Sequence, residues 1–410
     1  MTRELVFHLG DHKTGSTSIQ ATLRSKNWTG GGVGISFPVR NLYHAEISTA
    51  LQPQVLPNVR ERILKGLAER VSEQQEEVCV ISSESFEGVM PEAMQEALQI
   101  YFPAYAQSAR FIAYVRPHAD RIVSSFAELL KLGQQERSMD AYFQHVFEQG
   151  RFHYFPRFIQ WRRVFGSQFE LRPMIRSNLY QNCVVRDFMS FALNSTDFSL
   201  KAEPEANETV GVEDLAALGL LHRQLAGSKV SRHSVSAIGR NFGILLQSLA
   251  RQSATKLAMD KALYERVAEA YRDDAEELDE AFFTGQPMTG ALKAYGAKTV
   301  PAPQSLSAED HFSADEIRMM QCWSGLVQQM STIAPDLWAR HFTALRTGRG
   351  TESWLEIQVA DPDATEAPML RAKRNGPGGK GPGSRQWDRP NRQHPGKGAG
   401  QGRRNQQGGD

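Results

Sequence analysis

A lysine and several hydroxyl residues follow the first apolar run of this chain, in a segment that also holds two glycines. The apolar run covers residues 5–9, and the segment after it reads Gly10-Asp11-His12-Lys13-Thr14-Gly15-Ser16-Thr17-Ser18. Residues 19–23 then have a helix-like pattern. A strand, a glycine-rich turn and a helix leave unpaired backbone N–H groups at the positive end of the helix dipole. This junction therefore predicts a phosphate site, and a nucleotide is the expected ligand.

The glycine spacing matches the first half of an ATP-binding Walker A loop, but the residues after it do not. Ser16 and Thr17 stand where that loop would have Lys and Ser/Thr, and the lysine, Lys13, lies inside the loop instead. A kinase of P-loop descent is therefore an alternative that these residues disfavour. Glu84, just after the second apolar strand pattern, is the residue that could be argued as its acidic Mg²⁺ ligand.

A second anion site is predicted near Arg116. Residues 110–115 have the pattern of a buried strand, and Arg116 ends it. Pro117 fits an early helical position, and Ser124 lies about two helical turns further on. Arg116 and Ser124 are thus predicted to converge on one anion, since a guanidinium fork matches phosphate oxygens and a hydroxyl adds a hydrogen bond. The alternative for Arg116 alone is a surface ion pair with Asp120.

Together the two segments resemble the donor-binding motifs of sulfotransferases that use 3′-phosphoadenosine 5′-phosphosulfate (PAPS). In that family a Lys-Thr-Gly-Ser/Thr-Thr loop holds the 5′-phosphosulfate, and an Arg and a Ser at this spacing hold the 3′-phosphate. The resemblance implies a PAPS site formed by Lys13, Thr14, Gly15, Ser16, Thr17, Ser18, Arg116 and Ser124. Pro117-His118 departs from the Asn-Pro of many members, which affects the expected loop geometry. Similarity to bacterial members extends more weakly through most of residues 1–195.

The resemblance also implies an activity, namely transfer of a sulfuryl group to a hydroxyl or amine of a glycan or small metabolite. Lys13 is expected to stabilise the leaving phosphate, as the corresponding lysine does in the family, and no metal is expected. Glu84 is the first candidate for the general base, because a glutamate has this role in glycan-type relatives. A helix cap or ion pair is an equally good interpretation of Glu84. His12, His44 and His118 are alternative bases, since imidazole titrates near neutral pH.

The apolar periodicity predicts the elements that position these residues. Strand patterns recur at residues 4–9, 78–83, 110–115 and 169–172, with helical patterns at 56–71, 122–132 and 152–165 between them. This alternation predicts an α/β fold, a P-loop-like parallel β-sheet flanked by helices. Helical patterns then dominate at 212–225, 237–251, 261–283 and 314–342. We therefore expect a PAPS-binding core over residues 1–200 and a helical region over 201–350 that completes the domain, with an acceptor or cap role.

The C-terminal part of the chain has a different composition. Residues 371–410 carry ten Lys/Arg against two Asp, a net charge of +8 in a chain whose formal total is +1. They also hold 11 of the 33 glycines and one aromatic residue, Trp387. Such a segment buries too little apolar surface to offset the entropy of ordering, so residues 360–410 are predicted to be a disordered basic tail. Weak binding of nucleic acid or another polyanion through this tail is the third function class, and a merely solubilising tail is the alternative.

Composition also bears on the cellular location. The three cysteines, Cys79, Cys183 and Cys322, are widely spaced and indicate neither a disulfide framework nor a metal site. No run approaches the roughly 18 consecutive apolar residues that span a bilayer, and the N-terminus has no signal-peptide pattern. Animal glycan sulfotransferases with a similar loop usually carry a Golgi membrane anchor. The expectation is therefore a cytoplasmic, bacterial enzyme without a membrane span.

Overall fold

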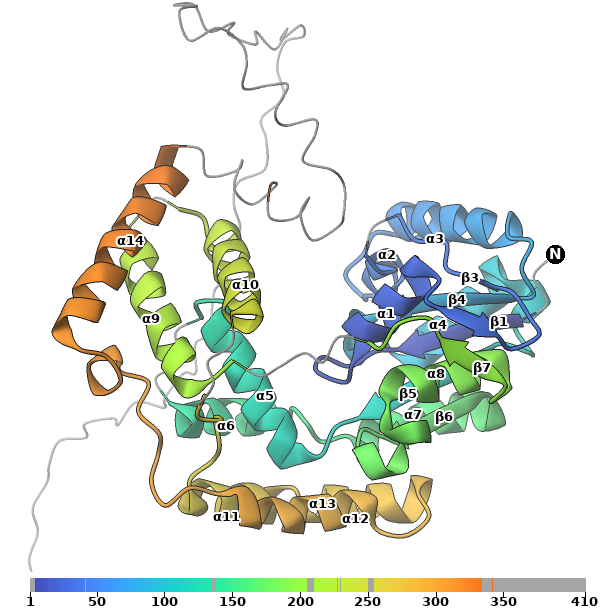
Figure 1. The fold of residues 1–410 in the computed structure, drawn as a ribbon. Coiled ribbons are helices and arrows are strands. Elements are labelled where there is room, and N and C mark those ends of the chain that lie inside the picture. Colours follow the sequence, from blue (N-terminus) through green and yellow to red (C-terminus); the bar gives the residue numbers. More distant parts are fainter. Residues whose placement is uncertain are drawn as a thin grey trace, which may run out of the picture. The chain divides into compact units, whose positions relative to one another are not determined.

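A computed structural model of the chain is shown in Figure 1. It describes residues 4–40, 42–134, 138–204, 210–226, 228, 230–249, 254–333 and 341. The chain divides into two compact units, Met1–Ser353 and Trp354–Asp410. The second unit, and with it the predicted disordered tail, lies outside the described residues. The fold below is that of the first unit.

A five-stranded parallel sheet forms the centre of the α/β part, as the sequence predicts. Its strands are β1 (Glu4–Leu9), β3 (Ile35–Ser36), β4 (Val78–Ser83), β5 (Arg110–Val115) and β6 (Phe169–Pro173), in the order β3-β4-β1-β5-β6. All neighbouring pairs are parallel. A separate antiparallel pair, β2 (Trp28–Gly30) with β7 (Phe198–Leu200), was not predicted, because each strand has only three residues.

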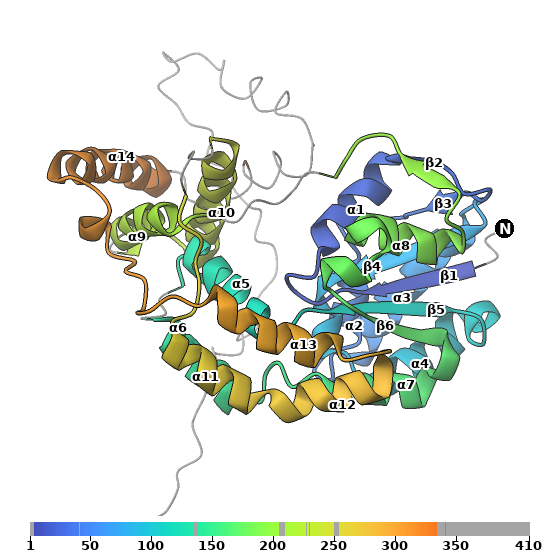
Figure 2. The ribbon, with the colours of Figure 1, turned by 60° about the horizontal axis from the view of Figure 1, so that its bottom comes forward.

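Helices cover both faces of the sheet (Figure 2). On one face, α1 (Ser16–Ser25) and α8 (Val184–Leu193) bury Ile19, Leu23 and Phe188 against Val6 and Val80. The other face carries α2 (Ala45–Ala50), α3 (Pro57–Ser72), α4 (Pro91–Tyr101) and α7 (Phe155–Phe165). Strand alternation explains this division, since successive side chains of β1 point to opposite faces and residues 5–9 are all buried.

The strands at the centre of the sheet lead to helices on opposite faces. After β1 the chain enters α1 on one face, whereas after the neighbouring β4 it enters the short helix η1 (Glu84–Gly88) and then α4 on the other. Open α/β sheets bind their ligands at the carboxyl ends of strands, at such a switch in direction. The predicted phosphate loop and Glu84 both lie at this point.

The part of the chain after β7 is helical, as predicted. Its helices are α9 (Val212–Ala226), α10 (Arg232–Ser248), α11 (Lys261–Ala270), α12 (Arg272–Phe282), α13 (Pro287–Ala294) and α14 (Ala314–Ile333). They share a core with α5 (His118–Lys131) and α6 (Met139–Glu148), which lie between β5 and α7 in the sequence. The predicted single helix over 261–283 is broken at Tyr271, whose φ of −115° is not helical. The buried Tyr271 ring packs against that of His118, so tertiary packing explains the break.

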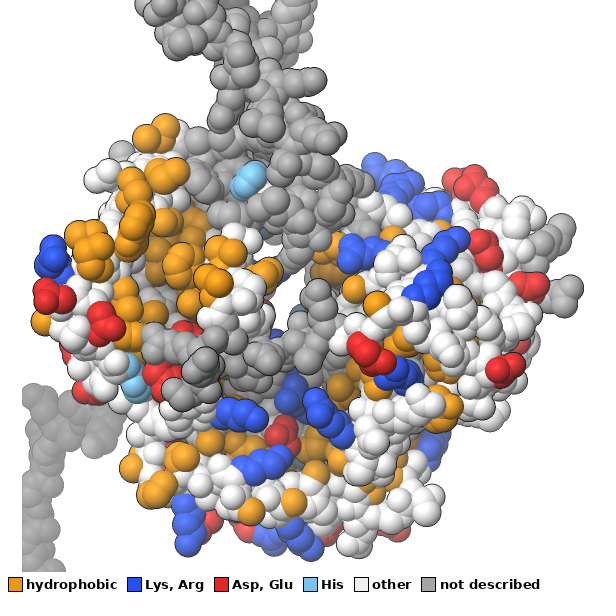
Figure 3. Space-filling model, viewed as in Figure 1, with side chains coloured by type: hydrophobic (Ala, Val, Ile, Leu, Met, Phe, Trp, Pro, Cys, Tyr) orange, Lys and Arg blue, Asp and Glu red, His pale blue; other side chains and the backbone are white. Residues whose placement is uncertain are grey.

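Hydrophobic side chains gather over α10 and α14 on the face shown in Figure 3. Of the thirteen large hydrophobic residues that are exposed within the described part of the chain, nine belong to this region: Phe242, Ile244, Leu245, Leu249, Met319, Trp323, Leu326, Met330 and Ile333. None of the described helices combines the length and apolar character that crossing a bilayer requires.

Candidate functional site

The loop between β1 and α1 presents a series of unpaired backbone N–H groups. Gly10 N–H donates to Ser83 O at 2.9 Å, and the N–H groups of Ser18 and Ile19 donate to Gly15 O. Between them, the N–H groups of residues 13–17 find no acceptor anywhere in the described part of the chain. Lys13 and Gly15 both have left-handed backbones, with φ of 67° and 84°. A turn of this kind at a helix N-terminus forms a concave anion site.

Close packing favours glycine at Gly10 and at Gly15, the two ends of this loop, because a side chain at either position would overlap its neighbours. A Cβ on Gly15 would lie 2.7 Å from Val184 Cγ1 of α8. A Cβ on Gly10 would lie 2.7 Å from Ser16 Oγ and 2.9 Å from Ser83 O. The loop is therefore held tightly between β4 and α8, which fixes the direction of its N–H groups.

Arg116 joins the two predicted anion segments. Its Nη1 donates to Lys13 O at 3.0 Å and to Ser124 Oγ at 3.3 Å. Asp120, the alternative partner, instead lies 3.6 Å from Lys298 Nζ. The structure thus brings Arg116 and Ser124 together, as the spacing predicted, and it sets them directly beside the loop between β1 and α1.

The side chain of Lys13 is held by an ion pair with α5. Lys13 Nζ lies 3.0 Å from Glu128 Oε2, and Lys131 Nζ lies 4.0 Å from the same oxygen. Burial is the largest single effect and raises the pKa of Glu128, but the charges of Lys13, Lys131 and Arg240 and the hydrogen bond from Lys13 together outweigh it, so the pKa is lowered. Glu128 follows Ser124 by one helical turn, so one face of α5 supplies partners for both Arg116 and Lys13.

Glu84 and His12 lie at the rim of the loop. Glu84 Oε1 accepts a hydrogen bond from Thr17 Oγ1 at 3.3 Å, and Glu84 Oε2 lies 3.7 Å from His12 Nδ1. Glu84 begins η1, and Ser83 caps that helix by accepting from Ser85 N–H. Both candidate bases therefore lie beside the loop, Glu84 in contact with the Thr17 hydroxyl and His12 within the loop itself.

The other two candidate bases lie elsewhere. His44 is fully buried, accepts a hydrogen bond from Ser82 N–H at 3.2 Å, and has its pKa lowered to about 3, chiefly by burial. His118 is also fully buried, and its Nε2 lies 2.8 Å from Asp274 Oδ2. Both side chains contact residues outside the loop, in positions where they stabilise the fold.

Two of the loop's hydroxyl groups close the loop on itself. Thr14 Oγ1 donates to Asp11 O at 2.7 Å, and Ser16 Oγ donates to the same oxygen at 3.4 Å. Both side chains are buried. In this conformation the backbone, and not these hydroxyls, presents the donors to an anion.

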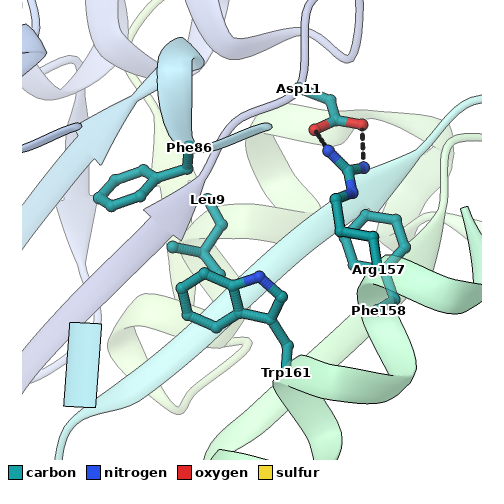
Figure 4. Close-up of a pocket in the computed structure, with 6 residues that line it drawn as sticks. All are labelled: Leu9, Asp11, Phe86, Arg157, Phe158 and Trp161. Atoms are coloured by element: carbon teal, nitrogen blue, oxygen red, sulfur yellow. Dashed lines mark hydrogen bonds and ion pairs between the residues drawn. The ribbon is translucent and has the colours of Figure 1, made fainter. Parts of the chain in front are cut away.

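An ion pair that the sequence analysis missed anchors the loop from the other face of the sheet. Arg157 of α7 donates from Nη1 and Nη2 to the two carboxylate oxygens of buried Asp11, at 2.8 and 2.6 Å (Figure 4). The small cavity beside this pair, about 10 Å³ and lined by Leu9, Asp11, Phe86, Arg157, Phe158 and Trp161, has room for one water molecule at most. Asp11 and Arg157 are 146 residues apart, so no local pattern signalled the contact.

Within the described ranges, no three or more His, Cys, Asp or Glu side chains form a group that could hold a metal ion. No protein-family model matches the chain, and neither the curated proteins nor the solved structures provide a match. The sulfotransferase resemblance consequently rests on the residues of the two anion segments.

Proposed function

We propose that this chain is a PAPS-dependent sulfotransferase. The observation that carries the proposal is the position of Arg116, which contacts both Ser124 and the backbone of Lys13. A nucleotide with phosphates on both its 5′ and 3′ oxygens needs two adjacent anion sites. Unpaired N–H groups supply one, and the Arg116–Ser124 pair supplies the other.

The donor site follows from these contacts. The N–H groups of residues 13–17 would receive the 5′-phosphosulfate, and Arg116 with Ser124 would receive the 3′-phosphate. Lys13 lies within the same loop, so its ammonium can compensate charge on the departing phosphate once it leaves Glu128. The acceptor oxygen bonds to sulfur as the bond from sulfur to the bridging oxygen breaks, and the phosphate keeps that electron pair.

The proton of the acceptor must also be removed. Glu84 is the best-placed group, because it adjoins Thr17 of the loop and is only partly buried. His12 stands beside it as the alternative. The proposed acceptor is a hydroxyl or amine of a glycan or small metabolite, and the helical region contributes to its recognition.

One observation favours a second candidate function, a P-loop-type kinase. The hydroxyl of Thr17 and the carboxylate of Glu84 are 3.3 Å apart, and P-loop enzymes hold Mg²⁺ with a loop Ser/Thr and an acidic residue that follows a strand. Ser16 occupies the Walker A lysine position, however, and a nucleoside triphosphate has no need of the Arg116–Ser124 site.

The 3′-phosphate assignment, which the kinase alternative does not need, is tested by Arg116→Ala, with Arg110→Ala as its matched control. Arg116 directly follows β5, whereas Arg110 is the first residue of that strand, at its opposite end, and binds Glu4 and the Phe191 carbonyl. We expect Arg116→Ala to weaken calorimetric binding of adenosine 3′,5′-bisphosphate far more than binding of adenosine 5′-phosphosulfate. Arg110→Ala should affect neither nucleotide selectively. Equal losses on both nucleotides for Arg116→Ala would remove the 3′-phosphate assignment.

A further inference from the structure

Asp274, on the first turn of α12, is the meeting point of three buried hydrogen bonds. Its Oδ2 lies 2.8 Å from His118 Nε2 and 3.0 Å from Tyr154 N, and its Oδ1 accepts from Phe155 N–H at 3.0 Å. The Asp274 side chain is 4% exposed. A carboxylate withdrawn from water in this way is stabilised only if its oxygens are hydrogen-bonded, which is the case here.

Two helices connect these hydrogen bonds to the phosphate loop. Tyr154 and Phe155 begin α7, and one turn later Arg157 holds Asp11 of the loop. His118 begins α5, two residues after Arg116, which holds the Lys13 carbonyl. The rings of Tyr154 and Tyr271 both pack against that of His118, with centroids 4.8 Å away in each case. Asp274 therefore fixes the starting points of both helices whose neighbouring arginines hold the loop.

From this geometry we infer that Asp274 is a positioning residue for the anion site, contributed by the helical region. The acidic side chain acts as a cap for α7, because it accepts the N–H groups that the first turn leaves unpaired. Through His118 it also fixes the start of α5. The inference rests on the proposed function only for the identity of the anion, since the contacts themselves involve the Lys13 carbonyl and the Asp11 carboxylate of the loop.

The test is Asp274→Asn, compared with Asp279→Asn. Both aspartates are buried on α12, and Asp279 likewise accepts from two N–H groups, those of Met288 and Thr289 at the start of α13. Asp279 has no bond to α5 or α7, so it reproduces the loss of a buried cap without touching the loop. An amide presents only one oxygen and turns an NH₂ group toward the remaining donors, so Asp274→Asn loses at least one of its three bonds.

We expect Asp274→Asn to weaken binding of adenosine 3′,5′-bisphosphate by about tenfold, and Asp279→Asn to leave binding within about twofold of the unmodified protein. In the nucleotide-free protein, amide hydrogen exchange should accelerate in Asp274→Asn and not in Asp279→Asn at the hydrogen-bonded N–H groups that bound the loop, those of Gly10, Ser18 and Ile19. Unchanged exchange and affinity in folded Asp274→Asn would overturn the inference.

The exchange measurement separates this inference from the proposed function. If the unmodified protein binds no bisphosphate, the proposed donor is wrong, and the exchange rates still decide whether Asp274 positions the loop. If Asp274→Asn does not fold, His118 gives a second test. His118→Gln keeps a nitrogen donor near the Nε2 position and should preserve loop protection, whereas His118→Phe should lose it; equal protection in the two would contradict the inference.

Discussion

Lys13 uses its backbone and its side chain for separate tasks. Its left-handed backbone turns the loop, its carbonyl accepts from Arg116, and its ammonium pairs with Glu128. Truncation at Cβ therefore removes the charge while the hydrogen bond to the carbonyl is kept. This separation makes the proposed catalytic role of the side chain testable without dismantling the loop.

Lys13→Ala is expected to lower the rate of sulfuryl transfer by at least about a hundredfold, because charge on the leaving phosphate is then uncompensated. Lys131→Ala is the matched control, since Lys131 approaches the same Glu128 oxygen but lies outside the loop. Release of adenosine 3′,5′-bisphosphate from PAPS measures the rate. Turnover at the unmodified rate in Lys13→Ala would exclude the role proposed for its ammonium.

Two buried histidines behind the site make stability depend on pH. Burial lowers the pKa of His8 and of His44 to about 3. In the unfolded chain these histidines have a pKa near 6.5. Between about pH 3 and 6.5 they are therefore protonated in the unfolded chain but remain neutral in the folded chain. The contribution of these two histidines to the free energy of unfolding should be greatest above about pH 6.5. It should fall as the pH drops toward 3, by at most about 1.4 kcal/mol per pH unit for each histidine.

Urea unfolding at several pH values checks this dependence. His44→Asn keeps an acceptor near the Nδ1 position for Ser82 N–H but does not titrate, so it should flatten the decline. His12→Asn, at a side chain that is 55% exposed, should leave the decline unchanged. An identical decline in His44→Asn and the unmodified protein would contradict this interpretation.

For individual residues, the sequence predicted contacts between a strand end and the helix that follows it better than contacts between distant segments. Arg116 and Ser124 are eight residues apart on a strand end and the following helix, so their spacing was enough to bring them together. Asp11 and Arg157, and His118 and Asp274, belong to different elements, and only tertiary packing joins them.

Among the elements, the β1–α1 junction is closely constrained by its packing. Its conformation depends on Gly15, where a left-handed backbone and contact with Val184 coincide. The strands around it were predictable because long apolar runs mark buried parallel strands. The two-residue β3 and the break between α11 and α12 were not, because neither leaves a periodic signal long enough to read.

Gly15→Ala should destabilise the fold more than Gly150→Ala. Gly150 also has a positive φ, 65°, but a Cβ there would meet nothing within 4 Å. Both variants incur about 1 kcal/mol for the left-handed backbone, and Gly15→Ala adds about 1–3 kcal/mol for overlap with Val184. Denaturant midpoints measure the difference.

A double variant tests the cause of this difference. In a Val184→Ala background, Gly15→Ala should lower the free energy of unfolding by less than it does in the unmodified protein. Equal destabilisation by Gly15→Ala and Gly150→Ala would show that packing is unimportant at Gly15.

For the whole molecule, the tail and the α/β part are expected to act separately. The positive charge of residues 371–410 predicts salt-sensitive retention on nucleic acid or another polyanion. Deletion of residues 375–410 should abolish any such retention and leave bisphosphate affinity unchanged, as measured by gel shift and calorimetry. Loss of bisphosphate binding on deletion would show that the tail belongs to the donor site.

The most direct test of the proposed function is calorimetric titration of the full chain with adenosine 3′,5′-bisphosphate, in parallel with ATP and Mg²⁺. The two adjacent anion sites predict tight binding of the bisphosphate without metal and little binding of ATP. Tight binding of ATP with Mg²⁺, and none of the bisphosphate, would contradict the account and favour the kinase alternative carried by Thr17 and Glu84.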